Sequence, residues 1–326
     1  MKILQLDPMC GIPVPPPAWG AIEKIVWEFK CNLDLLGHET DIKFITDIKK
    51  GQYDIVHCHV ANLALQLAEM GIPYIYQLHD HHAYYYGKDS YVFKQNYEAV
   101  EKSLVSLMPA NYLVDYFDNP KCMYFSHGVN TDEYKPNPKI DKVKTFLMLA
   151  NNGLAGDPSF DRKGFNFGIA LADMLEKDIT IAGPENNKHW FNNNLHLCKN
   201  KNVRLIFDPS LDQVVDMMNT HKIFLNPTML EAGHPNLTML EAAACGLPII
   251  ADWEENVFFN GAWRAPRDVF KMVEGYHVIM DNYKDYSMNA FLTARELSWY
   301  KRSKELVKIY ENYIIWKMFY WKNIII

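Results

Sequence analysis

The stretch Asn226–Ala251, NPTMLEAGHPNLTMLEAAACGLPIIA, decides the fold of this chain. An apolar run ends at Asn226, and a loop that contains Gly233 follows it. A helix is predicted over Leu237–Cys245, and a second apolar run covers Pro248–Ala251. This order of strand, loop, helix and strand is typical of a parallel sheet, because parallel strands need a crossover connection that is usually a helix. We therefore predict an α/β fold.

Strands and helices also alternate on both sides of this stretch. The other predicted strands are Lys2–Leu6, Thr40–Ile45, Asp54–His59, Pro73–Leu78, Met123–Phe125, Thr145–Ala150, Ile179–Ala182, Val203–Phe207 and Ile223–Asn226. The other predicted helices are Ala21–Leu36, Ala61–Met70, Phe167–Glu176 and Asp212–Asn219. Two such series predict two doubly wound domains, each a parallel sheet with helices on both faces.

The predicted domain boundary is Asn137-Pro138, which gives domains 1–138 and 139–296. The remaining segment, 297–326, is predicted to be a helix that packs back across the domains. Aromatic and basic residues interleave in it, so a helix lying in a membrane interface is the alternative. The apolar start of the chain is too short for a secretory signal, and no run reaches 18 apolar residues. We expect a cytoplasmic protein, at most peripheral to a membrane.

Charge is distributed unevenly along the chain. Residues 1–138 carry 11 lysines, no arginine and 17 acidic residues, and the first arginine is Arg162. Such a half is a poor surface for nucleic acid or anionic lipid, so we expect a neutral acceptor and no nucleic-acid partner. The six cysteines are scattered without a CxxC pair, which predicts free thiols and no metal site.

Two candidate residues follow predicted strands of the first domain, where ligands bind in open parallel sheets. Gly20 precedes the first predicted helix, where backbone N–H groups can approach an anion. His79 lies in the run Gln77–His82, which also holds His81 and His82. A histidine there can donate a hydrogen bond to a sugar hydroxyl or share a proton, and the cluster leaves a zinc site as an alternative.

The second domain supplies the remaining candidates. Arg162 and Lys163 precede the predicted helix Phe167–Glu176, where fixed cations suit a diphosphate; an exposed basic turn is the alternative. Glu231 can hold sugar hydroxyls, and Glu241 can accept hydrogen bonds from vicinal ribose hydroxyls. The start of the helix offers backbone amides to phosphate, from Asn236, Leu237 and Thr238.

These segments, in this order, resemble the retaining glycosyltransferases of family four, which include sucrose-phosphate synthase and phosphatidylinositol mannosyltransferase. The resemblance covers nearly the whole chain. The segments that carry it are Pro17–Val26, Asp54–His59, Ser126–Pro136, Glu231–Ala251, and Leu297–Trp299 with Glu305–Tyr310.

The resemblance implies a GT-B fold, in which two Rossmann-like domains enclose a cleft. Residues 1–138 would be the acceptor side, and 139–296 would bind the nucleotide sugar. It implies retaining transfer of a hexose or related sugar from a nucleotide diphosphate sugar to a hydroxyl acceptor, expected to be a glycan. Neither a metal nor a cofactor is expected, because a fixed Lys or Arg can neutralise the charge that builds on the departing diphosphate. The leaving phosphate would help to deprotonate the acceptor, so no catalytic base is expected either.

The resemblance also implies roles for single residues. Lys163 would bind the diphosphate, Glu231 the donor sugar, and His79 would sit beside the reacting carbon. Glu241 would bind the ribose, and Gly20 would let its loop touch phosphate. Arg162 would join Lys163, and the helix start at Asn236, Leu237 and Thr238 would hold phosphate.

Three positions depart from the family pattern. Glu231 and Glu241 are ten residues apart rather than eight, Asp157 stands where an arginine is usual, and Ala21 replaces a second glycine. These departures keep two alternatives open: a catalytically weak GT-B protein that binds nucleotide sugar or glycan, and a nucleotide-sugar epimerase. A dinucleotide dehydrogenase is disfavoured because no GxGxxG follows the first strand.

Overall fold

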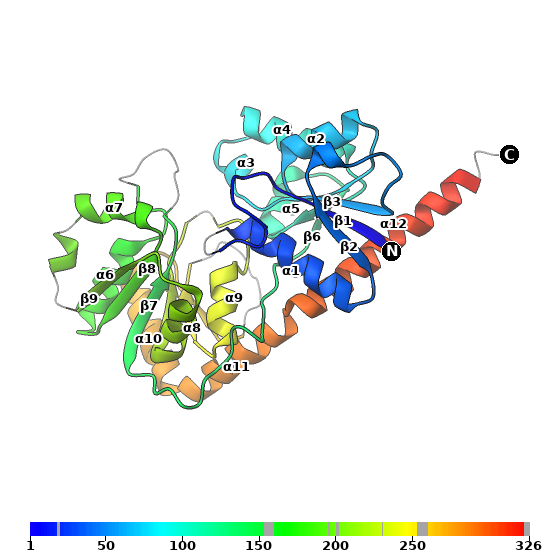
Figure 1. The fold of residues 1–326 in the computed structure, drawn as a ribbon. Helices are drawn as coiled ribbons and strands as arrows, with labels where there is room; N and C mark the ends of the chain where they lie inside the picture. The colour runs from blue at the N-terminus through cyan, green and yellow to red at the C-terminus, as the bar shows by residue number, and fades with distance from the viewer. Residues whose placement is uncertain are drawn as a thin grey trace. The chain divides into compact units, whose positions relative to one another are not determined.

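The computed structural model describes residues 1–17, 20–152, 160–194, 196–199, 202–229, 231–252 and 260–322. The chain divides into two compact units (Figure 1). Unit 1 comprises Met1–Gly128, Ala232–His234 and Ser298–Ile326, and unit 2 comprises Val129–Glu231 and Pro235–Leu297. Each unit contains a six-stranded sheet.

The sheet of unit 1 has the order β2-β1-β3-β4-β5-β6, and every pairing in it is parallel. Its strands are β1 Lys2–Leu6, β2 Glu39–Lys43, β3 Ile55–Cys58, β4 Ile75–Gln77, β5 Ser106–Met108 and β6 Cys122–Tyr124. The central strands β3, β4 and β5 are buried along their whole length. Burial of this kind requires helices on both faces, as in α/β proteins generally.

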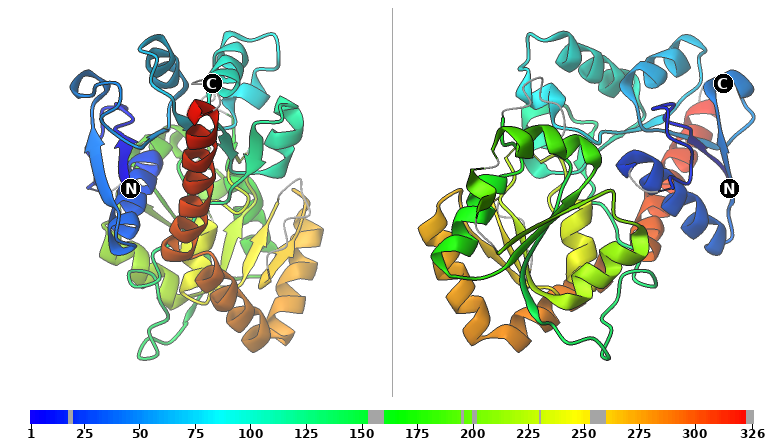
Figure 2. Two further views of the ribbon diagram at one scale, coloured as in Figure 1. Left: turned by 90° about the vertical axis from the view of Figure 1, so that its right-hand side faces the viewer. Right: turned by 60° about the vertical axis from the view of Figure 1, so that its left-hand side comes forward.

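The helices of unit 1 are α1 Ala21–Leu35, α2 Ala61–Glu69, α3 His82–Tyr85, α4 Tyr91–Lys102, α5 Asn111–Phe117 and α12 Trp299–Lys322. Helix α12 runs beside α1 (Figures 1 and 2). The Trp299 ring meets the Phe29 ring edge-on, with the centroids 5.1 Å apart. This buried aromatic contact anchors α12 on unit 1, although the two helices lie at opposite ends of the sequence.

The sheet of unit 2 has the order β12-β11-β10-β7-β8-β9 and is also parallel throughout. Its strands are β7 Lys144–Leu149, β8 Ile179–Gly183, β9 Val203–Phe207, β10 His221–Asn226, β11 Ile249–Ala251 and β12 Ala262–Arg264. Its α-helices are α6 Phe165–Met174, α7 Lys188–Asn193, α8 Leu211–Thr220, α9 Leu237–Ala244, α10 Val269–Asp281 and α11 Tyr283–Glu296. Helices α6 and α10 cover one face of the sheet, and α8 and α9 cover the other (Figure 2).

The predicted α/β architecture with two doubly wound parallel sheets is confirmed. Predicted strands and helices match the observed ones to within a few residues, and the predicted strand Thr40–Ile45 corresponds to β2. That strand ends at Lys43, and Ile45–Asp47 form a 3₁₀ turn that turns the Ile45 side chain into the core. No prediction covered the strands β5 and β12 or the helices α3, α4, α5, α7, α10 and α11. Trp19 and Asp157 lie outside the described residues.

The division between the units falls after Gly128, whereas the sequence analysis placed it at Asn137-Pro138. The Val129 N–H donates to the Leu297 carbonyl at 3.0 Å, and the Asn137 N–H donates to the Asn219 side chain at 2.7 Å. The intervening segment is therefore held by residues of unit 2. Among the described helices, none is long and apolar enough to cross a membrane.

Candidate functional site

The strand order of unit 2 reverses direction between β7 and β10. The chain leaves β7 for β8 on one side, and β10 later pairs with β7 on the other side. At such a switch point the two following loops diverge, which leaves room for a ligand at the carboxyl ends of the strands. The segment that ends at Lys163 follows β7, and Glu231 lies in the loop after β10.

Lys163, Arg162 and Glu231 meet at this switch point. The Lys163 ammonium donates a hydrogen bond to Glu231 Oε1, and Arg162 Nη1 lies 3.7 Å from the same oxygen. The three side chains are only 11%, 12% and 16% exposed, respectively. Burial lowers the pKa of Lys163, while the Glu231 charge opposes that shift. Two cations share one carboxylate, so the cluster retains a positive charge that suits an anion.

The backbone around Lys163 is fixed by polar contacts within its own loop. Asn152 Oδ1 accepts from the Lys163 N–H at 3.2 Å, and Arg162 Nε donates to the Asn152 carbonyl at 3.1 Å. The Asp161 carboxylate accepts from the Phe165 N–H at 2.8 Å, which satisfies one backbone donor at the start of α6. Gly164 has φ +74°, and a Cβ there would lie 2.4 Å from the Pro227 carbonyl oxygen. The loops after β7 and β10 approach this closely only because residue 164 has no side chain.

Arg267 ties the same two loops together, and the sequence analysis did not identify it. It lies just after β12, and its guanidinium donates to the Pro227 carbonyl at 2.7 Å and to the Asp161 carbonyl at 3.0 Å. A third hydrogen bond goes to the Arg162 carbonyl. The planar guanidinium group carries several N–H donors and can therefore hydrogen-bond to three carbonyls at once. A lysine ammonium cannot reproduce that geometry. Recognition of β12 as a strand would have drawn attention to the cation that follows it.

Helix α9 begins at the loop after β10. The Asn236 side chain caps it by accepting from the Met239 N–H at 3.0 Å, and the Thr238 hydroxyl donates to the same oxygen at 3.1 Å. Leu237 is the first helical residue, and Glu241 lies one turn further along, only 7% exposed. The helix start and the buried carboxylate therefore follow the same strand as Glu231.

Unit 1 contains the other two predicted residues, Gly20 and His79. Gly20 has φ +150° at the start of α1, and a Cβ there would lie 2.9 Å from Pro16 Cβ. His79 follows β4, and its Nε2 lies 2.9 Å from His59 Nδ1. Its ring stacks with that of His127 at a centroid distance of 6.0 Å. Burial lowers the pKa of His79 well below its ordinary value, and His59 and His127 lower it further, so the ring is neutral at pH 7.

The other histidines of the predicted cluster are placed differently. His81 is the N-cap residue that precedes α3, and its carbonyl accepts from the Tyr85 N–H at 2.9 Å. His82 lies within that short helix, 3.6 Å from Asp80. Within the described ranges, no group of three His, Cys, Asp or Glu side chains is arranged to hold a metal ion. All six cysteines are free, and Cys58 and Cys245 are buried.

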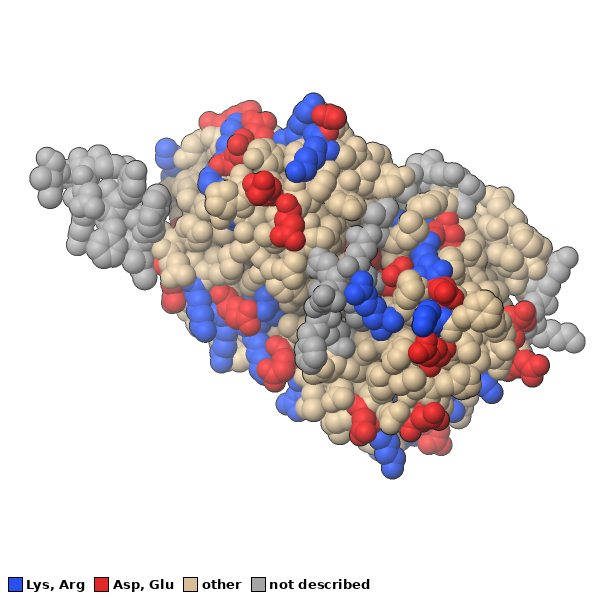
Figure 3. Space-filling view, turned by 180° about the vertical axis from the view of Figure 1, so that it is seen from behind, with Lys and Arg blue, Asp and Glu red and all other residues tan. Residues whose placement is uncertain are grey.

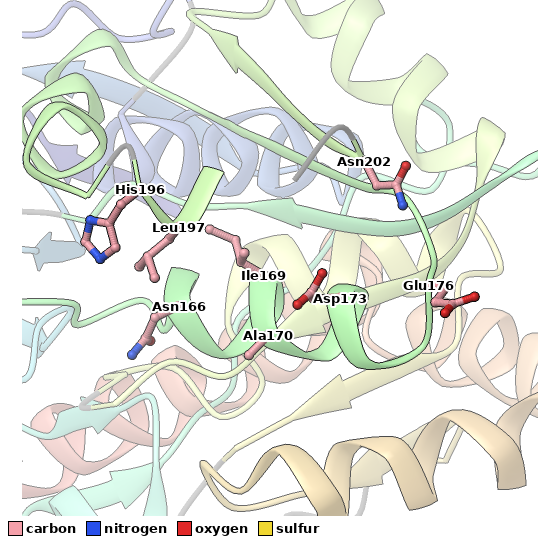
Figure 4. Close-up of a pocket in the computed structure, with 8 residues that line it drawn as sticks. All are labelled: Asn166, Ile169, Ala170, Asp173, Glu176, His196, Leu197 and Asn202. Atoms are coloured by element: carbon pink, nitrogen blue, oxygen red, sulfur yellow. The ribbon is translucent and has the colours of Figure 1, made fainter. Parts of the chain in front are cut away.

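A hollow of about 620 Å³ lies along α6, but none of the predicted site residues lines it (Figure 4). Asp173 and Glu176 contribute carboxylates to its wall, and its described lining contains no lysine or arginine. An acidic wall repels a diphosphate, so this hollow does not suit the predicted donor. Of the candidates, the structure brings Arg162, Lys163 and Glu231 into direct contact in unit 2.

Comparison with known proteins adds a family model and a set of solved structures. A family model described as glycosyl transferase-like matches residues 166–314. No curated protein matches the chain. Sucrose-phosphate synthase (tll1590) from Thermosynechococcus elongatus superposes with a TM-score of 0.75 at 12% identity, over 96% of this chain and 99% of that one.

Two further structures give the same result. AviGT4, a glycosyltransferase involved in avilamycin A biosynthesis, has a TM-score of 0.73 at 14% identity, over 96% of this chain and 98% of its own. Anabaena Alr3699/HepE, in complex with UDP and glucose, has a TM-score of 0.70 at 12% identity, over 96% of this chain and 100% of its own. The predicted GT-B fold is thereby confirmed.

Proposed function

We propose that this protein is a glycosyltransferase that moves a hexose or related sugar from a nucleotide diphosphate sugar to a hydroxyl acceptor, with retention of anomeric configuration. The observation that carries the proposal is the contact of Lys163 and Arg162 with Glu231 at the switch point of the unit 2 sheet. The match to a glycosyl transferase-like family model and the GT-B fold support it.

The donor would bind mainly to unit 2. Lys163 and Arg162 would hold the diphosphate, helped by the amides at the start of α9, from Asn236, Leu237 and Thr238. Glu241 would accept hydrogen bonds from the ribose hydroxyls. Glu231 would exchange part of its contact with Lys163 for hydroxyls of the donor sugar. The solved Anabaena structure with UDP and glucose supports a ligand of this class.

In the transfer step, negative charge would build on the departing phosphate oxygen as the bond to the sugar breaks. Fixed cations stabilise that charge without reorganisation, so Lys163 and Arg162 would replace a metal ion in this role. The departing phosphate would take the acceptor proton on the face where the acceptor attacks, which gives retention. Gly20 and His79 of unit 1 would contact the donor phosphate and sugar, respectively.

The acceptor is proposed to be a neutral saccharide. Residues 1–138 lack arginine and are acidic overall. On the face shown in Figure 3, acidic and basic side chains are interspersed rather than gathered by sign. Unit 1 also exposes the rings of Tyr85, Tyr86 and Tyr91, at 42%, 52% and 75%. Exposed rings with polar edges suit a sugar better than a phosphate backbone.

Incubation with UDP-, GDP- and ADP-sugars and a panel of saccharide acceptors tests the proposal. The expected result is release of one nucleoside diphosphate and a glycoside with the anomeric configuration of the donor, read by NMR, in the presence and absence of EDTA. Inversion would contradict the proposed mechanism, and a requirement for metal would contradict the role given to the cations. Tight binding without turnover would instead identify a catalytically weak binding protein, and an epimerised donor would identify an epimerase.

A further inference from the structure

A continuous chain of hydrogen bonds runs through unit 1 from α12 to His79. Tyr310 lies on α12, and its hydroxyl is 2.8 Å from His57 Nδ1 and 3.2 Å from Gln5 Nε2. The Gln5 amide oxygen is 2.9 Å from His59 Nε2, and His59 Nδ1 is 2.9 Å from His79 Nε2. Gln5 and His57 are register partners on the adjacent strands β1 and β3, which places both side chains on one face of the sheet.

The chain lies in the interior of the unit. Gln5, His57 and Tyr310 are fully buried, and His59 is 3% exposed. Burial lowers the pKa of His57 to about 3 and lowers those of His59 and His79 well below their ordinary values. All three imidazoles are therefore neutral at pH 7, so each carries its proton on one nitrogen only.

The hydrogen-bond partners of each imidazole determine which of its two nitrogens carries the proton. The Gln5 amide oxygen can only accept, so His59 Nε2 must donate to it. Neutral His59 then has a bare Nδ1, which can only accept, and His79 Nε2 must be its donor. His79 is left with a lone pair on Nδ1. That nitrogen is buried and has no hydrogen-bond partner among the described residues.

Gln5 is the residue on which this direction depends. Its amide nitrogen donates to the Tyr310 hydroxyl, whose oxygen also lies 2.8 Å from His57 Nδ1. If the amide turned by half a rotation, each donor along the chain would become an acceptor, and His79 Nδ1 would carry the proton. Tyr310 therefore acts through Gln5 and His59 on an atom it does not touch, as outer partners of other histidine sites do.

We propose that Gln5, held by Tyr310, fixes His79 in the tautomer protonated on Nε2, so that Nδ1 accepts a hydrogen bond from a hydroxyl of the donor sugar. An unpaired buried acceptor is costly, and a ligand hydroxyl supplies the missing donor. A carboxylate has no proton to donate, so a neutral hydroxyl is selected at this position over the acid group of a uronic sugar. The tautomer depends on unit 1 alone, whereas the sugar as partner rests on the proposed function.

The tautomer can be measured directly on the ligand-free protein. Long-range ¹H–¹⁵N correlation NMR on the histidine-labelled chain at pH 7.5 separates the two tautomers, and loss of signals in His79→Gln assigns them. The expected result is a proton on His79 Nε2 in the native protein and a mixture of tautomers in Gln5→Met and Tyr310→Phe. Tyr74→Phe removes another phenol of unit 1, which bonds to the Ala99 carbonyl, and should leave the His79 signals unchanged.

The inference is overturned if native His79 carries its proton on Nδ1, or if the tautomer is unaffected in the folded Gln5 and Tyr310 variants. Should Gln5→Met not fold, Tyr310→Phe decides the result alone. Tyr310→Phe should also lower kcat/KM with the donor on the order of tenfold, as expected for one misdirected hydrogen bond. If the native chain shows no sugar transfer but the tautomers behave as stated, the proposed function fails and the assignment of the His79 tautomer stands.

Discussion

Lys163 and Glu231 form an ion pair between two loops, although they lie 68 positions apart in the chain. The pair joins the ends of neighbouring strands at the point where the sheet of unit 2 reverses its order. Both side chains are largely buried, so each charge depends on the other to offset the loss of hydration. The same contact therefore bears on stability and on ligand binding.

Removing Lys163 or Glu231 alone should lower the free energy of unfolding by more than the ion pair contributes to it. Lys163→Met is expected to lower the free energy of unfolding by about 3 kcal/mol, because it removes the ammonium in direct contact with the buried Glu231 carboxylate. The double variant Lys163→Met/Glu231→Leu should be less destabilised than the sum of the single variants. A double-mutant cycle by urea denaturation measures this difference, and strictly additive effects would show that the pair is not coupled.

Arg267 should matter for donor binding although it is not proposed to touch the donor. Arg267→Met removes three hydrogen bonds to the carbonyls of Asp161, Arg162 and Pro227, so the loop that carries Lys163 loses its anchor. We expect nucleotide affinity to fall on the order of tenfold or more, equivalent to at least about 1.4 kcal/mol. Isothermal titration measures it.

Two further variants separate the shape of Arg267 from its charge. Arg267→Lys should rescue little, because an ammonium cannot reproduce the planar fork. Arg204→Met, at an exposed position of β9, is the matched control and should bind as the native protein does. Full rescue by lysine would show that the charge of residue 267, rather than its three contacts, supports binding.

The parts of this site that local patterns encode could be predicted from the sequence. The end of β10 and the start of α9 were predicted from an apolar run that ends at Asn226, a loop that contains Gly233 and a helical pattern from Leu237. Lys163 was placed near Glu231 because the carboxyl ends of parallel strands share one edge of a sheet.

Contacts that depend on pairings remote in sequence could not be predicted. Arg267 reaches Asp161 across 106 positions, and it does so from the end of β12, a strand of only three residues. The contact between Gln5 and Tyr310 spans 305 positions. A buried glutamine and a buried tyrosine have no periodic signal that distinguishes a polar chain from ordinary core packing.

Gly20 should tolerate no side chain. In Gly20→Ala the new Cβ would meet Pro16 Cβ at 2.9 Å, in a backbone conformation that L-residues rarely adopt. We expect a loss of about 2–3 kcal/mol in the free energy of unfolding, from strain and the forced shift of the loop together. Gly11→Ala is the control, because φ is also positive there but nothing lies within 4 Å of the new Cβ. Equal losses in the two variants would show that the contact with Pro16 does not matter.

The buried histidines of unit 1 should make stability fall at acidic pH. Their pKa values in the folded protein are lowered, so the folded state stays neutral while the unfolded state takes up protons below about pH 6.5. The stability that comes from keeping these histidines neutral is fully present above about pH 6.5. It is lost as the pH falls toward their pKa values in the folded protein, which is about 3 for His57. His57 should then cost about 2 kcal/mol between pH 7 and pH 5, and His59 and His79 should shift stability in the same direction.

His57→Asn isolates one of these contributions. An asparagine oxygen can accept from the Tyr310 hydroxyl in place of His57 Nδ1, but it does not titrate. Denaturation at pH 7 and pH 5 should show a pH effect smaller by about 2 kcal/mol than in the native chain. An unchanged pH effect would mean that His57 does not remain neutral in the folded protein.

The central claim is that unit 2 binds a nucleoside diphosphate through Lys163 and Glu241. The change in melting temperature on addition of UDP, GDP or ADP tests this claim most directly. Ligand at 100 times its dissociation constant should add about 2.7 kcal/mol of stability to the native protein. We predict that one nucleotide raises the melting temperature, that Lys163→Ala and Glu241→Ala each abolish this rise, and that Arg204→Met keeps it. A rise that persists undiminished in the folded Lys163 and Glu241 variants would contradict the account.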